Sequence, residues 1–143
     1  RLKQAPYPFL LLPHPTAVVG GRGTNAWSAL VDAARITRSR QISGLISLIE
    51  KHILIPKLPM ILMGDFNATA EEYTLREMLE RDHGIIQLKP QEDIATHPKA
   101  GTVDHIYFYP ASRLENYTCF VVNTPLAREI SDHLPIVADI TFQ

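Results

Sequence analysis

The spacing of apolar and polar positions first separates helical from extended stretches of the chain. Residues 25–55 carry apolar side chains every three or four positions, which is the spacing of one face of a helix. This stripe consists of Ile42, Leu45, Ile46, Ile49 and Ile53. Pro56 and Pro59 follow it, and a proline cannot continue a helix from within. We therefore expect one amphipathic helix that ends before residue 56.

Five other segments have the pattern of extended chain. Residues 6–12 and 60–63 are short apolar runs, and the second is apolar throughout, which predicts a strand covered on both faces. Residues 102–109 and 117–123 are also predicted as strands. Residues 134–142 alternate apolar and polar side chains with a period of two, the clearest strand pattern in the chain. Helical and extended stretches together predict an α/β fold.

Two weaker features lie between these segments. Thr69 and Glu72 have the spacing of a capping box, in which a hydroxyl and a carboxylate bond the first free N–H groups of a helix. A helix is therefore expected to begin at Thr69. Residues 83–101 are polar with scattered proline and glycine, and they predict a loop that contains a short strand near Ile85.

Composition limits the class of protein. The 143 residues fit one domain spanning 1–143, and 45% hydrophobic with 20% charged residues is ordinary for a globular protein. Fourteen basic against fifteen acidic residues give a net charge of -1, which argues against a broad phosphate-binding surface. The single cysteine, Cys119, excludes an internal disulfide and favours a reducing, cytoplasmic compartment. No apolar run reaches the roughly 18 residues of a transmembrane segment.

Candidate chemistry gathers at the ends of the predicted strands. Three pairs of residues are involved: Asp65 with Asn67, Asp104 with His105, and Asp132 with His133. Carboxylates are hard oxygen ligands suited to Mg²⁺ or Mn²⁺, and a histidine beside a carboxylate serves as a general acid or base. Each pair alone has a plainer interpretation, because Gly-Asp-Phe-Asn is a common turn composition and Asp132 is suited to cap a turn or helix. Three pairs at strand ends favour metal-assisted hydrolysis of a phosphoester.

The remaining histidines are interpreted as structural or solvent-exposed. His52, His83 and His97 have no carboxylate at an informative spacing, so we predict that they lie on the surface. His105 follows Asp104 and points to the opposite face of the same strand, since successive strand residues alternate faces. We expect His105 to pack or hydrogen-bond.

Three motifs in this order closely resemble those of the endonuclease/exonuclease/phosphatase superfamily. They are Met63–Ala68 (MGDFNA), Thr102–Ile106 (TVDHI) and Ser131–Ile136 (SDHLPI). The superfamily includes pancreatic deoxyribonuclease, abasic-site endonucleases, deadenylases, neutral sphingomyelinases and inositol polyphosphate 5-phosphatases. The resemblance implies a deoxyribonuclease-I-like fold, in which two sheets pack as a sandwich with helices outside.

An upstream element, Leu11–Pro15, is similar to a histidine-containing segment of the same family. The match is looser, because Pro13 stands where the family usually has threonine. A helix carrying Arg38 and Gln41 follows, as in the family. The resemblance implies that His14 is the family's other histidine, which faces the phosphate.

The resemblance also implies a role for each residue of the three motifs. Asp65 would orient or deprotonate the attacking water, and Asn67 would bind the scissile phosphate. Asp132 would be a metal ligand or a carboxylate near the metal. His133 would stabilise the transition state or transfer a proton, and Asp104 would hydrogen-bond His133 and fix its orientation.

The length of the chain departs from the family pattern. Family members usually need about 250 residues, and the glutamate that is their principal metal ligand has no counterpart upstream of His14. The chain therefore resembles only the C-terminal half to two-thirds of the family's fold. A partial sandwich exposes an apolar sheet face, so we expect a missing N-terminal segment or a partner chain to cover it.

Two functions follow from the resemblance. The first is hydrolysis of a phosphodiester or phosphomonoester by an activated water, with Mg²⁺ or Mn²⁺ as cofactor. Small molecules, lipid headgroups and short nucleic acids all remain possible substrates. The alternative is a catalytically inactive fragment or relative that binds another protein through the exposed sheet face.

Overall fold

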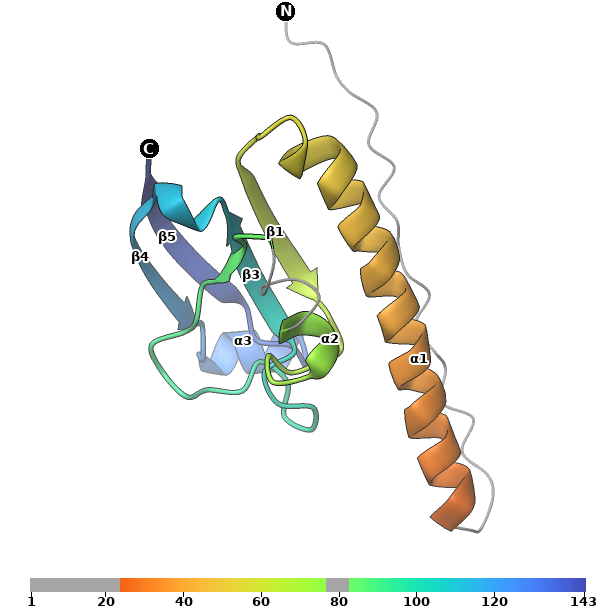
Figure 1. The fold of residues 1–143 in the computed structure, drawn as a ribbon. Helices are drawn as coiled ribbons and strands as arrows, with labels where there is room; N and C mark the ends of the chain where they lie inside the picture. Colours follow the sequence, from red (N-terminus) through yellow and green to blue (C-terminus); the bar gives the residue numbers. More distant parts are fainter. Residues whose placement is uncertain (1–23, 77–82) are drawn as a thin grey trace, which may run out of the picture.

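A computed structural model of the chain describes residues 24–76 and 83–143. One long helix, α1 (Thr24–Ile49), continues into the π-helical turn η1 (Glu50–Leu54) and lies along one side of the strands (Figure 1). The predicted helix over residues 25–55 is thus confirmed, and it ends before Pro56. None of the helices within these described ranges combines the length and apolar character needed to cross a bilayer. The predicted strand at residues 6–12 and the His14 element lie outside the described residues.

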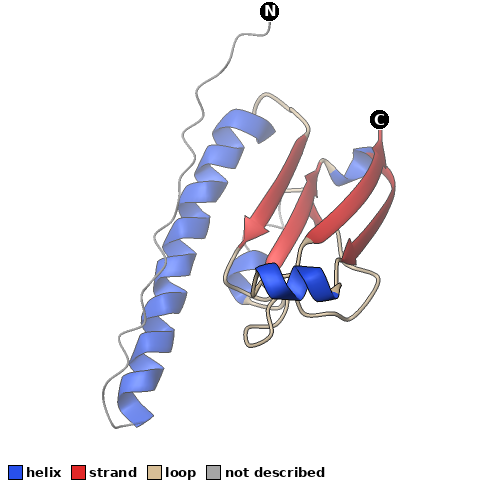
Figure 2. Ribbon diagram, turned by 180° about the vertical axis from the view of Figure 1, so that it is seen from behind, coloured by secondary structure: helices blue, strands red, loops and turns tan. Residues whose placement is uncertain are grey.

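The described strands form two antiparallel sheets (Figures 1 and 2). The first sheet has the order β1–β3–β2, where β1 is Met60–Asp65, β2 is Ile86–Gln87 and β3 is Asp104–Tyr109. The second sheet pairs β4 (Leu114–Val121) with β5 (Ile136–Phe142). The strands predicted near Ile85 and in the three later segments are therefore present. The prediction of mixed helix and sheet is confirmed.

The apolar stripe of α1 packs against one face of the first sheet. Ile42 and Ile49 are buried there with Leu75 and Tyr107, and the other members of the stripe are partly buried against this cluster. Each square ångström of apolar surface removed from water stabilises the fold by about 25 cal/mol. The three-and-four spacing read from the sequence thus decides which face of the helix meets the sheet.

A second apolar cluster joins the two sheets. Its buried members are Leu88, Ile106, Phe108 and Cys119, and side chains from β4 and β5 pack against them. Cys119 is fully buried in this cluster, and burial raises the pKa of its thiol. One face of the first sheet consequently packs against α1, and on the other face Ile106 and Phe108 contact side chains of β4 and β5.

The prediction that β1 is covered on both faces was wrong. Met60 and Leu62 pack against the helical layer, whereas Ile61 and Met63 are 46% and 65% exposed. Among the described strands, β1 lies at one edge of its sheet, and side chains of β4 and β5 pack against the neighbouring β3. An apolar run in the sequence therefore indicates a strand here, but it does not indicate how many of its faces are buried.

The predicted capping box was also wrong. Helix α2 (Tyr73–Leu75) begins four residues after Thr69, and Glu72 precedes it without a side-chain cap. The Glu72 carboxylate instead accepts two hydrogen bonds of 3.2 Å from Nε and Nη2 of Arg38 on α1. The bidentate bond to the Arg38 guanidinium is charge-assisted, and this tertiary contact determines where the Glu72 side chain points.

Strand register brings the candidate chemistry to one edge of the molecule. β1 and β3 are antiparallel, and Asp65 at the end of β1 lies opposite Asp104 at the start of β3. Helix α3 (Pro125–Ile130) and the loop that leads into β5 lie at the same end (Figure 2). At the other end, a 3₁₀ turn η3 (Ala111–Arg113) connects β3 to β4.

Candidate active site

An aspartate and a histidine from distant parts of the chain are hydrogen-bonded in the site. His133 Nδ1 lies 2.8 Å from Asp104 Oδ2, although the two residues are 29 positions apart. An ionised carboxylate only accepts hydrogen bonds, so Nδ1 carries the proton and donates it. The second ring nitrogen, Nε2, is left to accept a proton from, or return one to, a reacting group. Both side chains are half-buried, at 31% and 16% exposure.

The surrounding carboxylates change the acidity of His133. The hydrogen bond to Asp104 raises the pKa of His133 above its ordinary value, and partial burial opposes this effect. The negative charges of Asp104, Asp65 and Asp132 raise the pKa further. A larger fraction of His133 is therefore imidazolium near neutral pH, which suits it to donate a proton or to face a negatively charged phosphoryl group.

Asp65 and Asn67 belong to a tight turn after β1. Asp65 Oδ1 accepts a 2.7 Å hydrogen bond from the Asn67 backbone N–H, and Oδ2 accepts one of 3.1 Å from Asn67 Nδ2. Asn67 has a φ of 50°, in the left-handed region that asparagine tolerates. Between them, Phe66 is half-buried and packs edge-on against Tyr107. This segment thus forms a turn and also carries an exposed carboxylate.

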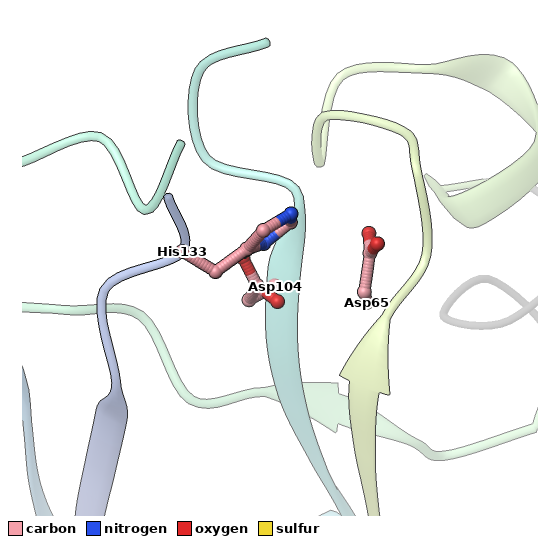
Figure 3. Close-up of side chains that lie close together, drawn as sticks. All are labelled: Asp65, Asp104 and His133. Atoms are coloured by element: carbon pink, nitrogen blue, oxygen red, sulfur yellow. The ribbon is translucent and has the colours of Figure 1, made fainter. Parts of the chain in front are cut away.

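Three potential ligands converge at this edge. Donor atoms of Asp65, Asp104 and His133 all lie within 4.8 Å of one another (Figure 3). The two carboxylates are hard oxygen ligands of the kind that Mg²⁺ and Mn²⁺ take, and the imidazole nitrogen is a softer ligand beside them. Asp65 is exposed, so its remaining lone pairs are accessible to an ion or a water molecule. The donor set therefore fits a divalent cation.

Asp132, which the resemblance implied as a metal ligand, is not one of these three residues. The Asp132 side chain is 77% exposed, and its Oδ2 lies 3.7 Å from His97 Nε2. Its predicted role as a metal ligand stays a prediction. His14, predicted to face the phosphate, lies outside the described residues.

The interpretation of His97 as a surface histidine was wrong. Its side chain is only 19% exposed, and its ring centroid lies 4.9 Å from that of His133. The carboxylate near it, Asp132, is 35 positions later in the sequence, so local spacing carries no signal for this contact. Only the fold brings His97 to the site.

His105 is buried, as expected for the opposite face of β3. Its Nε2 donates to the Ala68 carbonyl at 2.8 Å, and its Nδ1 accepts from Gln87 Nε2 at 2.8 Å. These assignments follow because a carbonyl oxygen only accepts. His105 therefore fixes the loop after Asn67 to the first sheet, and its contacts are those of a structural residue.

The match to known families agrees with this geometry. Residues 3–133 match the model of the Endonuclease/Exonuclease/phosphatase family, which covers most of the chain. The chain belongs to this family, whose members are generally hydrolytic enzymes that depend on divalent metals. Comparison with curated proteins and with solved structures returned no match.

Proposed function

We propose that the protein is a metal-dependent phosphoesterase that uses an activated water as nucleophile. The observation that carries the proposal is the convergence of Asp65, Asp104 and His133 within 4.8 Å in a member of this family. These residues come from three separate segments, and a turn or a cap at any one of them does not require the other two. Their shared position supports a common chemical task.

Each side chain supplies a distinct part of the reaction. Asp65 orients the water and accepts its proton, since its carboxylate is exposed and held by the Asn67 turn. The second N–H of the Asn67 amide is available to a phosphate oxygen, because a side-chain amide has two donors. His133, oriented by Asp104, donates a proton or a hydrogen bond to the oxygens on which negative charge develops.

The same residues account for the cofactor. Asp65 and Asp104 are the oxygen ligands that would hold Mg²⁺ or Mn²⁺ beside His133, and Asp132 is a further carboxylate close to it. When bound, such an ion neutralises charge that develops on the phosphoryl group. The family's general dependence on divalent metals supports this assignment.

Overall charge favours short substrates over long nucleic acids. A net charge of -1 provides little of the electrostatic attraction that dominates binding along a nucleic-acid backbone. We therefore infer a small phosphodiester, a lipid headgroup or a short nucleic acid as substrate. The second apolar cluster, which contains residues from both sheets, supports the two-sheet sandwich of the family as the scaffold for this site.

One observation favours a second function. Ile61 and Met63 expose an apolar strip on the edge strand β1, and such strips commonly mark protein interfaces. An inactive chain that binds a partner through this strip is therefore the alternative to the enzyme.

Hydrolysis of bis-p-nitrophenyl phosphate tests the two functions directly. The purified chain should release p-nitrophenol in Mg²⁺ and stop when EDTA is added. Asp65→Asn and His133→Gln should abolish the activity, whereas His52→Gln, a change at an exposed histidine on η1, should retain it. A folded chain with no Mg²⁺-dependent release at any substrate concentration would reject the enzyme and favour the interaction module.

A further inference from the structure

One buried threonine is bonded to both segments that carry the His133–Asp104 pair. Thr96 is fully buried, and its Oγ1 accepts hydrogen bonds from the backbone N–H groups of Val103 (3.1 Å) and Asp104 (3.2 Å). Its carbonyl oxygen accepts a 2.7 Å bond from the N–H of Leu134, the residue after His133. Asp104 opens β3, and Leu134 leads into β5, which belongs to the other sheet. Thr96 therefore ties the two sheets together beside the pair.

The next residue contacts the side chains of the site. His97 Nδ1 accepts from the N–H groups of Lys99 (3.1 Å) and Ala100 (2.9 Å), which fixes the ring and leaves the proton on Nε2. The His97 ring then lies against His133, with centroids 4.9 Å apart and planes at 58°. Its Nε2 faces Asp132 Oδ2 at 3.7 Å.

A closed turn holds this histidine in place. His97 and Gly101 exchange two backbone hydrogen bonds, of 2.9 and 3.0 Å. Gly101 has a φ of +82°, a backbone conformation that side chains larger than hydrogen rarely adopt. The turn returns the chain directly to β3, so the position of the His97 ring is coupled to that of Asp104.

We propose that Thr96 and His97 act together as a clamp that positions His133 for catalysis. Thr96 sets the spacing between the Asp104 and His133 segments, and His97 restricts the orientation of the His133 ring. The hydrogen bond to Asp104 alone leaves the ring free to pivot about Nδ1, and the His97 ring limits this movement from one face. Neither residue reacts with substrate, so both are positioning residues. The consequence for turnover rests on the proposed phosphoesterase function, whereas the consequence for His133 geometry does not.

A matched pair of substitutions at Thr96 tests the first half of the clamp. Thr96→Val keeps the shape of the side chain but removes the oxygen that accepts two N–H bonds, and Thr96→Ser keeps that oxygen. Valine should lower kcat on bis-p-nitrophenyl phosphate by about tenfold or more with KM within about twofold, as expected for a group that orients a catalytic one. Serine should keep kcat within about threefold of the wild-type value. Equal kcat values for valine and wild type would overturn the role of Thr96.

His97→Asn tests the second half of the clamp at a side chain that is partly exposed, whereas Thr96 is fully buried. Asparagine retains an acceptor near the Nδ1 position and so keeps the turn to Lys99 and Ala100, but it removes the ring and Nε2. We expect kcat to fall about tenfold. The same substitution at exposed His52 is the control and should leave kcat unchanged. A wild-type kcat for His97→Asn would overturn the role of His97, and this variant also decides the matter if Thr96→Val fails to fold.

A spectroscopic measurement separates the clamp from the proposed activity. In metal-free, ¹⁵N-histidine-labelled protein at constant pH, the Nδ1–H proton of His133 reports its hydrogen bond to Asp104. That resonance should persist in Thr96→Ser and be lost or broadened in Thr96→Val and His97→Asn. If the wild type hydrolyses nothing yet the resonance responds in this way, the clamp stands and the phosphoesterase proposal fails. An unchanged resonance in both variants would overturn the clamp, whatever the activity.

Discussion

The side chains of Asp104 and His133 are hydrogen-bonded although they lie 29 positions apart in the sequence. The Asp65 carboxylate, in contrast, accepts hydrogen bonds from Asn67, two positions further along. The first pair is half-buried, and its segments are tied together through backbone bonds from different parts of the fold. The Asp65 side chain is exposed, and its carboxylate is bonded locally. Tertiary structure therefore fixes the orientation of the histidine half, while the aspartate half keeps an accessible carboxylate for an ion or water.

The largest expected effect on kcat comes from substituting the Asp104–His133 pair. His133→Gln should lower kcat by about a thousandfold, because it removes the group that exchanges a proton with the reacting phosphoester. Asp104→Asn should also lower kcat, since an amide facing Nδ1 no longer stabilises the proton there. Steady-state hydrolysis of bis-p-nitrophenyl phosphate measures both. If Asp104→Asn retained the wild-type kcat, the long-range contact would be structural and the comparison of the two halves would lose its functional meaning.

Substitution of the exposed Asp65 should have the largest effect on the stabilisation of the fold by Mg²⁺. In the wild type, Mg²⁺ at a hundred times its Kd should stabilise the folded chain by about 2.7 kcal/mol, because the ion binds the native state. Asp65→Asn should lose most of this stabilisation, since it removes the most accessible charged ligand. Thermal unfolding with Mg²⁺ and with EDTA measures the difference. A similar Mg²⁺-induced rise in Tm for Asp65→Asn and wild type would place the ion away from this turn.

The same division explains how far the sequence predicted the site. The Gly64–Asn67 segment is short, so composition and neighbours along the chain were enough to indicate both a turn and a candidate carboxylate at a strand end. The Asp104–His133 contact was expected only through the resemblance to a family, because no local pattern links residues 29 positions apart. His97 was misread for this reason, since its neighbours in space come from the segment around residue 132.

The fold was predictable within a similar limit. Apolar patterns predicted α1 and most of the strand segments, because each pattern is set by neighbours one to four positions away. It failed for Ile61 and Met63, whose exposure depends on where the second sheet packs. It failed also at Glu72, where a contact to Arg38 replaced the predicted local cap.

A smaller effect should appear in the backbone of the Asp65 turn. Asn67 has a φ of 50°, so Asn67→Ala should destabilise the fold by about 1 kcal/mol through the steric cost of a left-handed conformation. Asn67→Gly adopts the same conformation without that cost, although it also lacks the amide. Urea unfolding in EDTA compares the two variants. Equal stability for alanine and glycine would mean that the turn relaxes freely and that local geometry does not hold Asp65.

The smallest effect concerns the pH dependence of the stability that the Asp104–His133 pair contributes. The pKa of His133 is raised in the folded chain, chiefly by the hydrogen bond to Asp104. A raised pKa means that the folded state binds the proton more tightly than the unfolded state. The stabilisation is therefore complete below the unfolded pKa of about 6.5 and is lost as the pH rises through the higher folded value. For a partly exposed pair we expect it to be about 0.5 kcal/mol.

Urea unfolding of wild type and His133→Gln in EDTA, at pH 6 and at pH 8.5, measures this contribution. The stability advantage of the wild type should be larger at pH 6. In an Asp104→Asn background most of that pH dependence should vanish, because the principal cause of the raised pKa is gone, while the weaker effects of Asp65 and Asp132 remain. A stability advantage of the wild type that instead grew toward pH 8.5 would mean that burial lowers the pKa of His133 more than the carboxylates raise it. His133 would then be held more by packing against His97 than by charge.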